Sequence, residues 1–307
     1  MSNIKKVLII GGNGFIGENL SSYLKDSGFE VTSFDIRLPQ NQTDNIKYVK
    51  GNFFDENDLF DAINNQNMIV HAISTITPGN SDQKYMNGYE KDFLQSVKLF
   101  EKVIENDQKL LFLSSGGTVY GNQNTQPIIE ETIPHPINHY GNVKLCIENV
   151  IRLFNRQYKS NLKIARISNP YGPGHNSEKG IGFLDTALKN AMLNKPIEIW
   201  GKGKNIRDYV YISDVCTMLG DILLYDGEID VFNVSTGIGT SQLEIIDKIK
   251  RLGYKPEVKF CDSRDIDTGK NILDNSRIME FSSCRPLLLD EGLNKYHNYL
   301  SKVLFNN

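Results

Sequence analysis

The sequence has few of the residues that build disulfide frameworks, metal centres or membrane spans. Its four cysteines, Cys146, Cys216, Cys261 and Cys284, lie far apart without C-x-x-C spacing, so we expect reduced thiols in a cytoplasmic protein and no bound metal. No apolar run approaches the ~18 residues of a membrane span. Residues 1–6 lead directly into an apolar segment, and we therefore expect no signal peptide.

Charge of one sign is also not concentrated anywhere in the chain. The 307 residues include 34 Lys+Arg against 37 Asp+Glu, a net charge of -3, and no basic block stands out. This excludes nucleic acid as a principal partner. A hydrophobic content of 39% is typical of a globular protein, and the length allows one large α/β unit or a main domain with a smaller lobe.

What is present begins with a glycine fingerprint. The apolar run Val7–Ile10 is too short for a helix and leads into Gly11, Gly14 and Gly17, before a segment from 18 to 26 that can form a helix. In a dinucleotide-binding turn, the first glycine permits the tight turn and the second lets a pyrophosphate approach the backbone. The third lets the helix pack on the strand.

The start of this helix is the predicted phosphate site. Unpaired N–H groups and the helix dipole favour negative charge there, so Phe15 and Ile16 join the three glycines as candidate cofactor contacts. A second strand, Glu30–Asp35, ends in an acid about 20 residues beyond the glycines, where a carboxylate accepts hydrogen bonds from the adenosine ribose. Asp35 would repel a 2′-phosphate and Arg37 offers it charge, so the sequence favours NAD(H) and leaves NADP(H) open.

Strand-like and helix-like segments alternate through the first half of the chain, which predicts an α/β fold with a parallel sheet. Further strands are predicted at residues 46–49, 68–72 and 110–113, and a helix at 92–105. The segment Ser114–Gly121 leaves the carboxyl end of the fifth strand as a loop. Ligands of open α/β sheets bind beyond the carboxyl ends of strands, so we expect this loop to face the cofactor.

A tyrosine and a lysine carry the predicted chemistry. Tyr140 and Lys144 lie four residues apart in a segment from 139 to 158 that can form a helix, which places both side chains on one helical face. An ammonium beside a phenol stabilises the phenolate, so we expect Lys144 to lower the pKa of Tyr140 from its ordinary value of ~10. Tyr140 would then exchange a proton near neutral pH, as acid–base catalysis requires.

Taken in order, these features resemble the extended short-chain dehydrogenase/reductase (NAD-dependent epimerase/dehydratase) family, in its nucleotide-sugar 4-epimerase and 4-ketoreductase branch. The resemblance covers nearly the whole chain and continues through four later motifs, Arg166–Gly174, Ile199–Gly203, Arg207–Val215 and Phe232–Ser235. It implies a Rossmann-type doubly wound parallel sheet in residues 1–166, which about 205–235 rejoin. A smaller C-terminal substrate-binding lobe would lie mainly in residues 167–307.

The resemblance also assigns roles to single residues. Tyr140 would be the catalytic acid/base, and Lys144 would bind the nicotinamide ribose and tune the tyrosine. Asn52 and Phe53 would lie beside the adenine ring. Asn169 would border the nicotinamide and the substrate.

Two arginines match positions that hold the substrate diphosphate in the family. These are Arg207 and Arg264, and the planar guanidinium fork suits phosphate oxygens. An ion pair with a neighbouring acid is the alternative for each. Asp208 is adjacent to Arg207, and Arg264 lies within the acidic stretch Asp262–Asp265.

Three features depart from the family pattern. Gly116 stands where a Ser or Thr usually faces the sugar C4 oxygen, so Ser115 or Thr118 would replace it as the catalytic hydroxyl unless the tyrosine acts alone. Asp92 stands in place of the usual Asn and cannot donate the hydrogen bonds of an amide. Dehydratases carry adjacent Asp and Glu where this chain has Gly116 and Gly117, which argues against a 4,6-dehydratase.

We therefore expect an enzyme, an NAD(P)-dependent oxidoreductase that reduces the C4 keto group of a nucleotide-linked sugar such as dTDP-4-dehydro-6-deoxyglucose. An NAD-dependent UDP-hexose 4-epimerase is the alternative, and Asp35 fits it because an epimerase keeps NAD bound. The missing hydroxyl at Gly116 and a chain that is short for a hexose 4-epimerase favour the reductase. A dinucleotide-binding protein without turnover is a further alternative.

The resemblance also sets expectations for the surroundings of the protein. Members of the family commonly pair through the helix that carries the catalytic tyrosine and its neighbour, so we expect a homodimer. Nucleotide sugars feed the synthesis of surface polysaccharides, including lipopolysaccharide, so we expect a role in cytoplasmic precursor synthesis.

Overall fold

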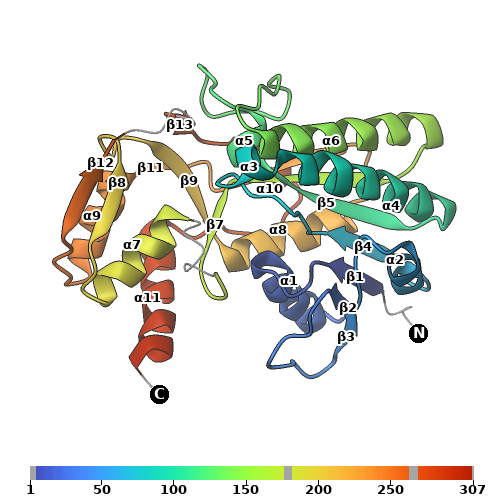
Figure 1. Ribbon diagram of the computed structural model, residues 1–307, viewed down its shortest axis with the longest axis horizontal. Helices are drawn as coiled ribbons and strands as arrows, with labels where there is room; N and C mark the ends of the chain where they lie inside the picture. The colour runs from blue at the N-terminus through green and yellow to red at the C-terminus, as the bar shows by residue number, and fades with distance from the viewer. Residues whose placement is uncertain (1–4, 176–181, 263–268, 306–307) are drawn as a thin grey trace.

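Seven parallel strands form the centre of the protein. The computed structural model describes residues 5–175, 182–262 and 269–305, and Figure 1 shows a large layered unit on the right with a smaller lobe on the left. The large sheet has the order β10-β6-β5-β4-β1-β2-β3, and all neighbouring pairs are parallel. Its strands are β1 (Lys6–Ile10), β2 (Glu30–Asp35), β3 (Ile46–Lys50), β4 (Met68–His71), β5 (Lys109–Ser115), β6 (Leu162–Ile167) and β10 (Val231–Val234).

The central strand β1 is buried on both faces. Side chains alternate along a strand, so Val7 and Ile9 enter the core on one face while Leu8 and Ile10 enter the core on the other. All four are fully buried. The continuous apolar run that predicted this strand is therefore the run expected for a parallel sheet covered on both sides.

Helices cover both faces of the large sheet (Figure 1). The side of Val7 and Ile9 carries α1 (Phe15–Asp26) and α8 (Ile212–Leu224). The opposite side carries α2 (Glu56–Ile63), α4 (Leu94–Glu105) and α6 (His139–Tyr158). Shorter elements are α3 (Ser81–Met86), the π-helix η1 (Asn87–Phe93), α5 (Gly116–Val119) and α10 (Ser276–Met279). This arrangement confirms the predicted doubly wound α/β fold.

The smaller lobe is built on two short sheets. One has the order β11-β9-β13, with β7 also paired to β9, and the other pairs β12 with β8. Tyr171, Leu188 and Tyr296 belong to the separate core that its helices and strands enclose. The elements are β7 (Asn169–Tyr171), β8 (Ile197–Trp200), β9 (Ile206–Tyr211), β11 (Gly239–Ser241), β12 (Val258–Cys261), β13 (Lys270–Asn271), α7 (Phe183–Met192), α9 (Gln242–Arg251) and α11 (Leu289–Phe305).

The chain passes between the two units more than once. After β7, the helix α7 and strands β8 and β9 lie in the smaller lobe, and α8 and β10 then return to the large unit. Within the segment 205–235, we therefore place residues 206–211 in the smaller lobe and residues 212–234 in the large unit. Residues 167–307, which the sequence assigns mainly to the smaller lobe, therefore contribute to both units.

Two local elements differ from the sequence-based expectation. The segment after β5 is not a plain loop, because residues 116–119 form the short helix α5. The helix expected at 92–105 is preceded by a π-helix turn, so that Asp92 lies in η1 and the regular α4 begins at Leu94. The helix from His139 to Tyr158 has the predicted limits.

A buried ion pair joins β6 to α6. The side chains of Arg166 and Glu148 are both fully buried, and Arg166 Nη2 lies 2.6 Å from Glu148 Oε2. Ser114 Oγ of β5 donates to Glu148 Oε1 at 2.6 Å, and the guanidinium carbon lies 4.6 Å from the centre of the Tyr120 ring. These contacts fix α6 against the carboxyl ends of β5 and β6.

Removing one partner of this pair should destabilise the protein strongly. In Glu148→Ala the Arg166 guanidinium stays buried without its carboxylate, so the free energy of unfolding measured in urea should fall by about 3–5 kcal/mol. The matched control is Asp247→Ala, which removes the exposed pair with Lys250 on α9 and should cost less than about 1 kcal/mol. Equal losses in the two variants would contradict a structural role for the buried pair.

Candidate active site

The glycine fingerprint forms a tight turn between β1 and α1. Gly11 has a φ of +84°, a conformation that favours glycine, and its N–H donates to Phe34 O at 2.9 Å. A Cβ on Gly17 would lie 2.3 Å from Gly11 O, so the helix can approach the strand only with glycine there. Both observations agree with the predicted roles of these glycines.

The start of α1 fits a phosphate group. A Cβ on Gly14 would meet Gly11 O at 3.2 Å and no other described protein atom within 4 Å. No side chain of the described residues caps this helix, so the backbone N–H groups at Phe15 and Ile16 can donate hydrogen bonds to a bound anion. The residues present therefore fit a dinucleotide pyrophosphate.

Asp35 lies beside this turn, at the end of β2. Its Oδ2 accepts a hydrogen bond from the N–H of Asn13 at 3.2 Å. The Asn13 side chain in turn donates to Arg37 O and accepts from Ser33 Oγ. These contacts hold the carboxylate at the carboxyl edge of the sheet, where the ribose of a dinucleotide would lie.

Asn52 and Phe53 follow β3 at the same edge of the sheet. Asn52 is fixed by its own backbone turn, because its N–H donates to Asp58 Oδ2 and its Oδ1 accepts from the N–H of Phe54. The Phe53 side chain is buried in the core, with its ring 5.1 Å from that of His71. Phe53 would therefore meet an adenine ring through its backbone.

Tyr140 and Lys144 lie together at the carboxyl end of β5. Lys144 Nζ lies 5.7 Å from the centre of the Tyr140 ring and 4.7 Å from that of Phe112, and it donates to Leu113 O at 3.0 Å. Tyr140 is half-buried and forms a hydrogen bond with the Ser115 side chain. The structure thus brings together the three residues expected to carry the proton chemistry.

The prediction that Tyr140 has a lowered pKa beside Lys144 is wrong. Burial raises the pKa of Tyr140 to about 12, the nearby Asp92 carboxylate raises it too, and the hydrogen bond with Ser115 offsets only part of this. Burial also lowers the pKa of Lys144 to about 8, against the opposing influence of Asp92 and Glu148. Tyr140 therefore holds its proton at neutral pH, because partial removal of its hydroxyl from water penalises the phenolate.

The place of the missing hydroxyl is filled from the other end of the chain. A Cβ on Gly116 would lie 2.3 Å from Leu273 Cδ1 and 3.1 Å from Arg166 O. Asn271 Nδ2 donates to Gly116 O at 3.2 Å. Of the two hydroxyls expected to replace the missing one, Ser115 contacts Tyr140 and Thr118 Oγ1 contacts Ser115 O at 3.5 Å.

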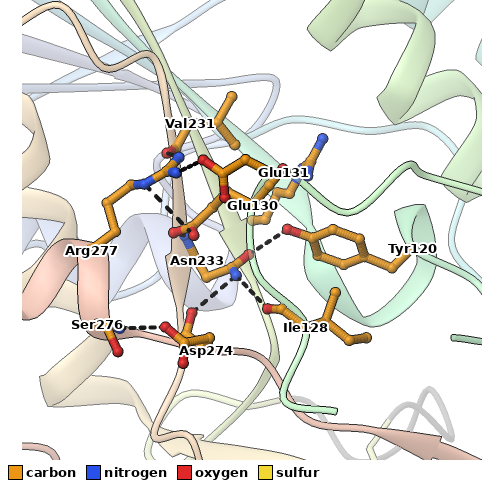
Figure 2. Close-up of polar contacts among 10 residues, drawn as sticks. Tyr120, Ile128, Glu130, Glu131, Val231, Asn233, Asp274, Ser276 and Arg277 are labelled. Carbon is orange, nitrogen blue, oxygen red and sulfur yellow. Dashed lines mark hydrogen bonds and ion pairs between the residues drawn. The ribbon is translucent and has the colours of Figure 1, made fainter. Parts of the chain in front are cut away.

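Figure 2 shows the polar contacts around Tyr120, the residue that follows α5 in the chain. Tyr120 Oη donates to Asn233 Oδ1 at 2.8 Å, and Asn233 Nδ2 donates to the carbonyl oxygens of Ile128 and Asp274. The group continues through Glu130, Glu131, Val231, Ser276 and Arg277. The active-site turn is thus tied to β10 and to the C-terminal segment.

Asn169 and Arg207 lie where the two units meet. Asn169 Nδ2 donates to Asp208 O at 3.0 Å, and a Cβ on Gly117 would lie 3.9 Å from Asn169 Oδ1. Arg207 Nη1 contacts its neighbour Ile206 O, and the buried Asp208 carboxylate accepts from Thr236 and Gly237. Arg264 lies outside the described residues.

Comparison with known proteins agrees with this geometry. The model of the NAD dependent epimerase/dehydratase family matches residues 7–235. The chain belongs to this family. It is 30% identical to the dTDP-4-dehydro-6-deoxyglucose reductase of Escherichia coli, over 94% of this chain and 95% of that protein. It is 28% identical to a putative UDP-glucose 4-epimerase of Methanocaldococcus jannaschii, over 96% of this chain and 98% of that protein.

A solved structure is also similar over the whole length. The UDP-glucose 4-epimerase of Thermotoga maritima, with UDP-glucose, has a TM-score of 0.90 and 28% identity, and the match covers 97% of this chain and 99% of that chain. An epimerase of this length contradicts the expectation that the chain is short for a hexose 4-epimerase. The predicted enzyme of an NAD-dependent nucleotide-sugar family is confirmed. Among the described residues, no helix is long and apolar enough to span a membrane.

Sequence reasoning missed the residues that support the site from behind. Asn233, Asn271 and Leu273 hold or cover the active-site turn through contacts between positions more than 100 residues apart. Asn233 lies in the motif Phe232–Ser235, to which the family resemblance assigns no role. Nothing in the local pattern around Asn271 and Leu273 indicates their contact with Gly116.

Gly17 offers a direct test of the cofactor turn. In Gly17→Ala the new Cβ must displace backbone at Gly11 and Gly12, so we expect a loss of about 1–3 kcal/mol of unfolding free energy. NAD affinity in calorimetric titration should fall by more than about tenfold, or 1.4 kcal/mol. Gly269→Ala is the control, because its Cβ would meet no described atom within 4 Å. Unchanged NAD binding in Gly17→Ala would contradict the close approach.

Proposed function

We propose that this protein reduces the C4 keto group of a nucleotide-linked sugar, such as dTDP-4-dehydro-6-deoxyglucose, with Tyr140 as the proton donor. The observation that carries the proposal is the placement of Tyr140 beside Ser115 and Lys144 at the carboxyl end of β5, where burial and the Asp92 charge raise the pKa of Tyr140 and so favour its protonated form. A general acid must hold its proton until the carbonyl oxygen takes it. The similarity to the Escherichia coli reductase supports the same reaction.

Each residue of the site has a part in this reaction. The bound nicotinamide supplies the hydride. Tyr140 gives its proton to the C4 oxygen, and the Ser115 hydroxyl beside it orients that oxygen. The Lys144 ammonium, held by Leu113 O, binds the nicotinamide ribose and stabilises the phenolate that forms. Arg207, on the central strand of the small sheet, binds the substrate diphosphate, for which a guanidinium fork is suited.

The alternative is a UDP-hexose 4-epimerase that works with permanently bound NAD. The similarity to the Thermotoga maritima enzyme favours it, as does Asp35 beside the cofactor turn. An epimerase must first remove a proton from the C4 hydroxyl, which requires the phenolate form of Tyr140. The raised pKa of Tyr140 opposes that step, so we favour the reductase. We favour NADH over NADPH as its cofactor because the Asp35 carboxylate would repel a 2′-phosphate.

Assembly and location are also part of the proposal. The side chains of Leu94 on α4 and Leu153 on α6 are exposed, and the two helices are neighbours on one face of the sheet (Figure 1). A homodimer that pairs through these helices would bury both leucines. The four cysteines are unpaired, in keeping with a reducing cytoplasm.

The reaction can be tested on the purified protein. The protein is denatured and any released dinucleotide identified, and oxidation of NADH and NADPH is then followed with dTDP-4-dehydro-6-deoxyglucose. A reductase should consume reduced cofactor in proportion to the sugar, with NADH preferred. NAD that stays bound through purification, together with interconversion of UDP-glucose and UDP-galactose, would establish the epimerase instead. Cofactor binding without turnover of either sugar would favour the non-catalytic alternative.

The proton donor has its own test. Tyr140→Phe removes the transferable proton, so kcat should fall by about 10²–10⁴-fold, the usual contribution of general acid catalysis. The affinity for NADH, measured by fluorescence titration, should change little. Tyr158→Phe is the matched control, since Tyr158 is exposed at the far end of the same helix. Ordinary turnover in Tyr140→Phe would exclude this tyrosine as the donor.

A further inference from the structure

The buried carboxylate of Asp92 influences Tyr140 electrostatically but has no role in the reaction proposed above. Asp92 is only 3% exposed and belongs to the π-helix η1. Its two oxygens accept from the N–H of Thr75 at 2.8 and 3.1 Å, and Oδ2 also accepts from Ser74 Oγ at 2.9 Å. Ser74 and Thr75 follow β4 at the carboxyl edge of the large sheet, so Asp92 is anchored on the cofactor side.

The π-helix η1 is pressed against the first turns of α6. Asn142 Nδ2 of α6 donates to Tyr89 Oη at 2.8 Å, and Tyr89 Oη contacts His139 Nδ1 at 3.0 Å. A Cβ on Gly88 would lie 2.9 Å from Val143 Cγ2. The segment that carries Asp92 therefore packs directly on the helical turn that carries Tyr140 and Lys144.

The charges around this turn can be assigned one by one. Tyr140 feels the charge of Asp92 from η1, forms a hydrogen bond with Ser115 of β5 and has Lys144 of its own helix beside its ring. Lys144 is influenced electrostatically by Asp92 and by Glu148 of α6. It acts in turn on His71 of β4, whose pKa burial lowers well below its ordinary value, so this histidine is neutral.

The two carboxylates near Lys144 differ in their partners. Glu148 is ion-paired with Arg166 and has a smaller influence on Lys144 than Asp92 has, whereas Ser74 and Thr75, which bind Asp92, carry no charge. Asp92 raises the pKa of both Tyr140 and Lys144, as expected of a negative charge that favours the protonated form of each group.

We propose that Asp92 is a positioning residue that balances the Lys144 charge and keeps the proton on Tyr140, which sets the site to reduce a ketone. The preference for reduction over oxidation rests on the proposed function. In reduction, Tyr140 would give its proton to the carbonyl oxygen while a bound nicotinamide would supply the hydride to the carbonyl carbon, and the resulting phenolate would take a proton from water. In oxidation, the phenolate must exist first, beside the negative charge of Asp92.

The proposal is tested by titrating Tyr140 in the substrate-free protein. Tyrosine labelled with ¹³C at Cζ reports the phenol-to-phenolate change by NMR, and the Tyr140 signal is the one missing from Tyr140→Phe. Asp92→Asn keeps the shape and one acceptor oxygen for Thr75 N–H but removes the charge. The pKa of Tyr140 should fall by about one unit in this variant. An unchanged pKa would overturn the proposal.

A second variant separates charge from structure. Ser74→Ala removes one hydrogen bond to Asp92 and leaves its charge, so the pKa of Tyr140 should stay at the wild-type value. A fall of the same size as in Asp92→Asn would mean that Asp92 acts only by holding the 74–75 segment, and the proposal would be wrong. Both titrations need no substrate, so their outcome does not depend on whether the proposed reaction is correct.

Turnover then tests the preference for reduction. With the sugar substrate found to turn over, the ratio of kcat for alcohol oxidation to kcat for ketone reduction, each measured at saturating substrate and cofactor and at fixed pH, should rise about tenfold in Asp92→Asn, because one pKa unit corresponds to a tenfold change in the phenolate fraction. An unchanged ratio despite a lowered Tyr140 pKa would overturn the link to reaction direction. Absence of turnover in the wild-type protein would instead overturn the proposed function and leave the titration result standing.

Discussion

The ion pair between Arg166 and Glu148 is the contact on which the site depends. Glu148 lies one helical turn beyond Lys144, and its carboxylate is held by Arg166 of β6 and Ser114 of β5. Because both charged groups are fully buried, neither can leave the pair without a large electrostatic cost. The pair therefore fixes the rotation and height of α6, so that Tyr140 stands over the carboxyl end of β5.

Electrostatics at the site follow from burial more than from sequence neighbours. The ammonium of Lys144 lies beside the Tyr140 ring, yet burial outweighs its charge, and Asp92 adds a second influence in the same direction. A tyrosine that keeps its proton suits the donor of a ketone reduction. Relatives of this chain include a reductase and an epimerase, and we propose that the balance of charge around this phenol helps to determine which reaction the site favours.

Much of the framework could be predicted from sequence because its signals are local. The run Val7–Ile10, the glycines after it and Asp35 lie within about 30 residues of each other, as a βαβ unit requires, and all take the predicted places. The spacing of Tyr140 and Lys144 also sets their common helical face. The prediction that Lys144 lowers the pKa of Tyr140 failed, because the degree of burial and the approach of Asp92 are set by packing between segments.

The amino-acid sequence alone therefore determined the fold class, the glycine turn after β1 and the helix that carries Tyr140 and Lys144, since periodicity, glycine spacing and helical geometry act over short distances. Tertiary structure decided which hydroxyl meets Tyr140, what fills the space at Gly116 and which way the proton equilibrium is set. Leu273 reaches Gly116 from 157 residues along the chain, and Asp92 reaches Tyr140 through the packing of η1 on α6. Contacts of this kind leave no local pattern, because they depend on where the folded chain brings distant segments together.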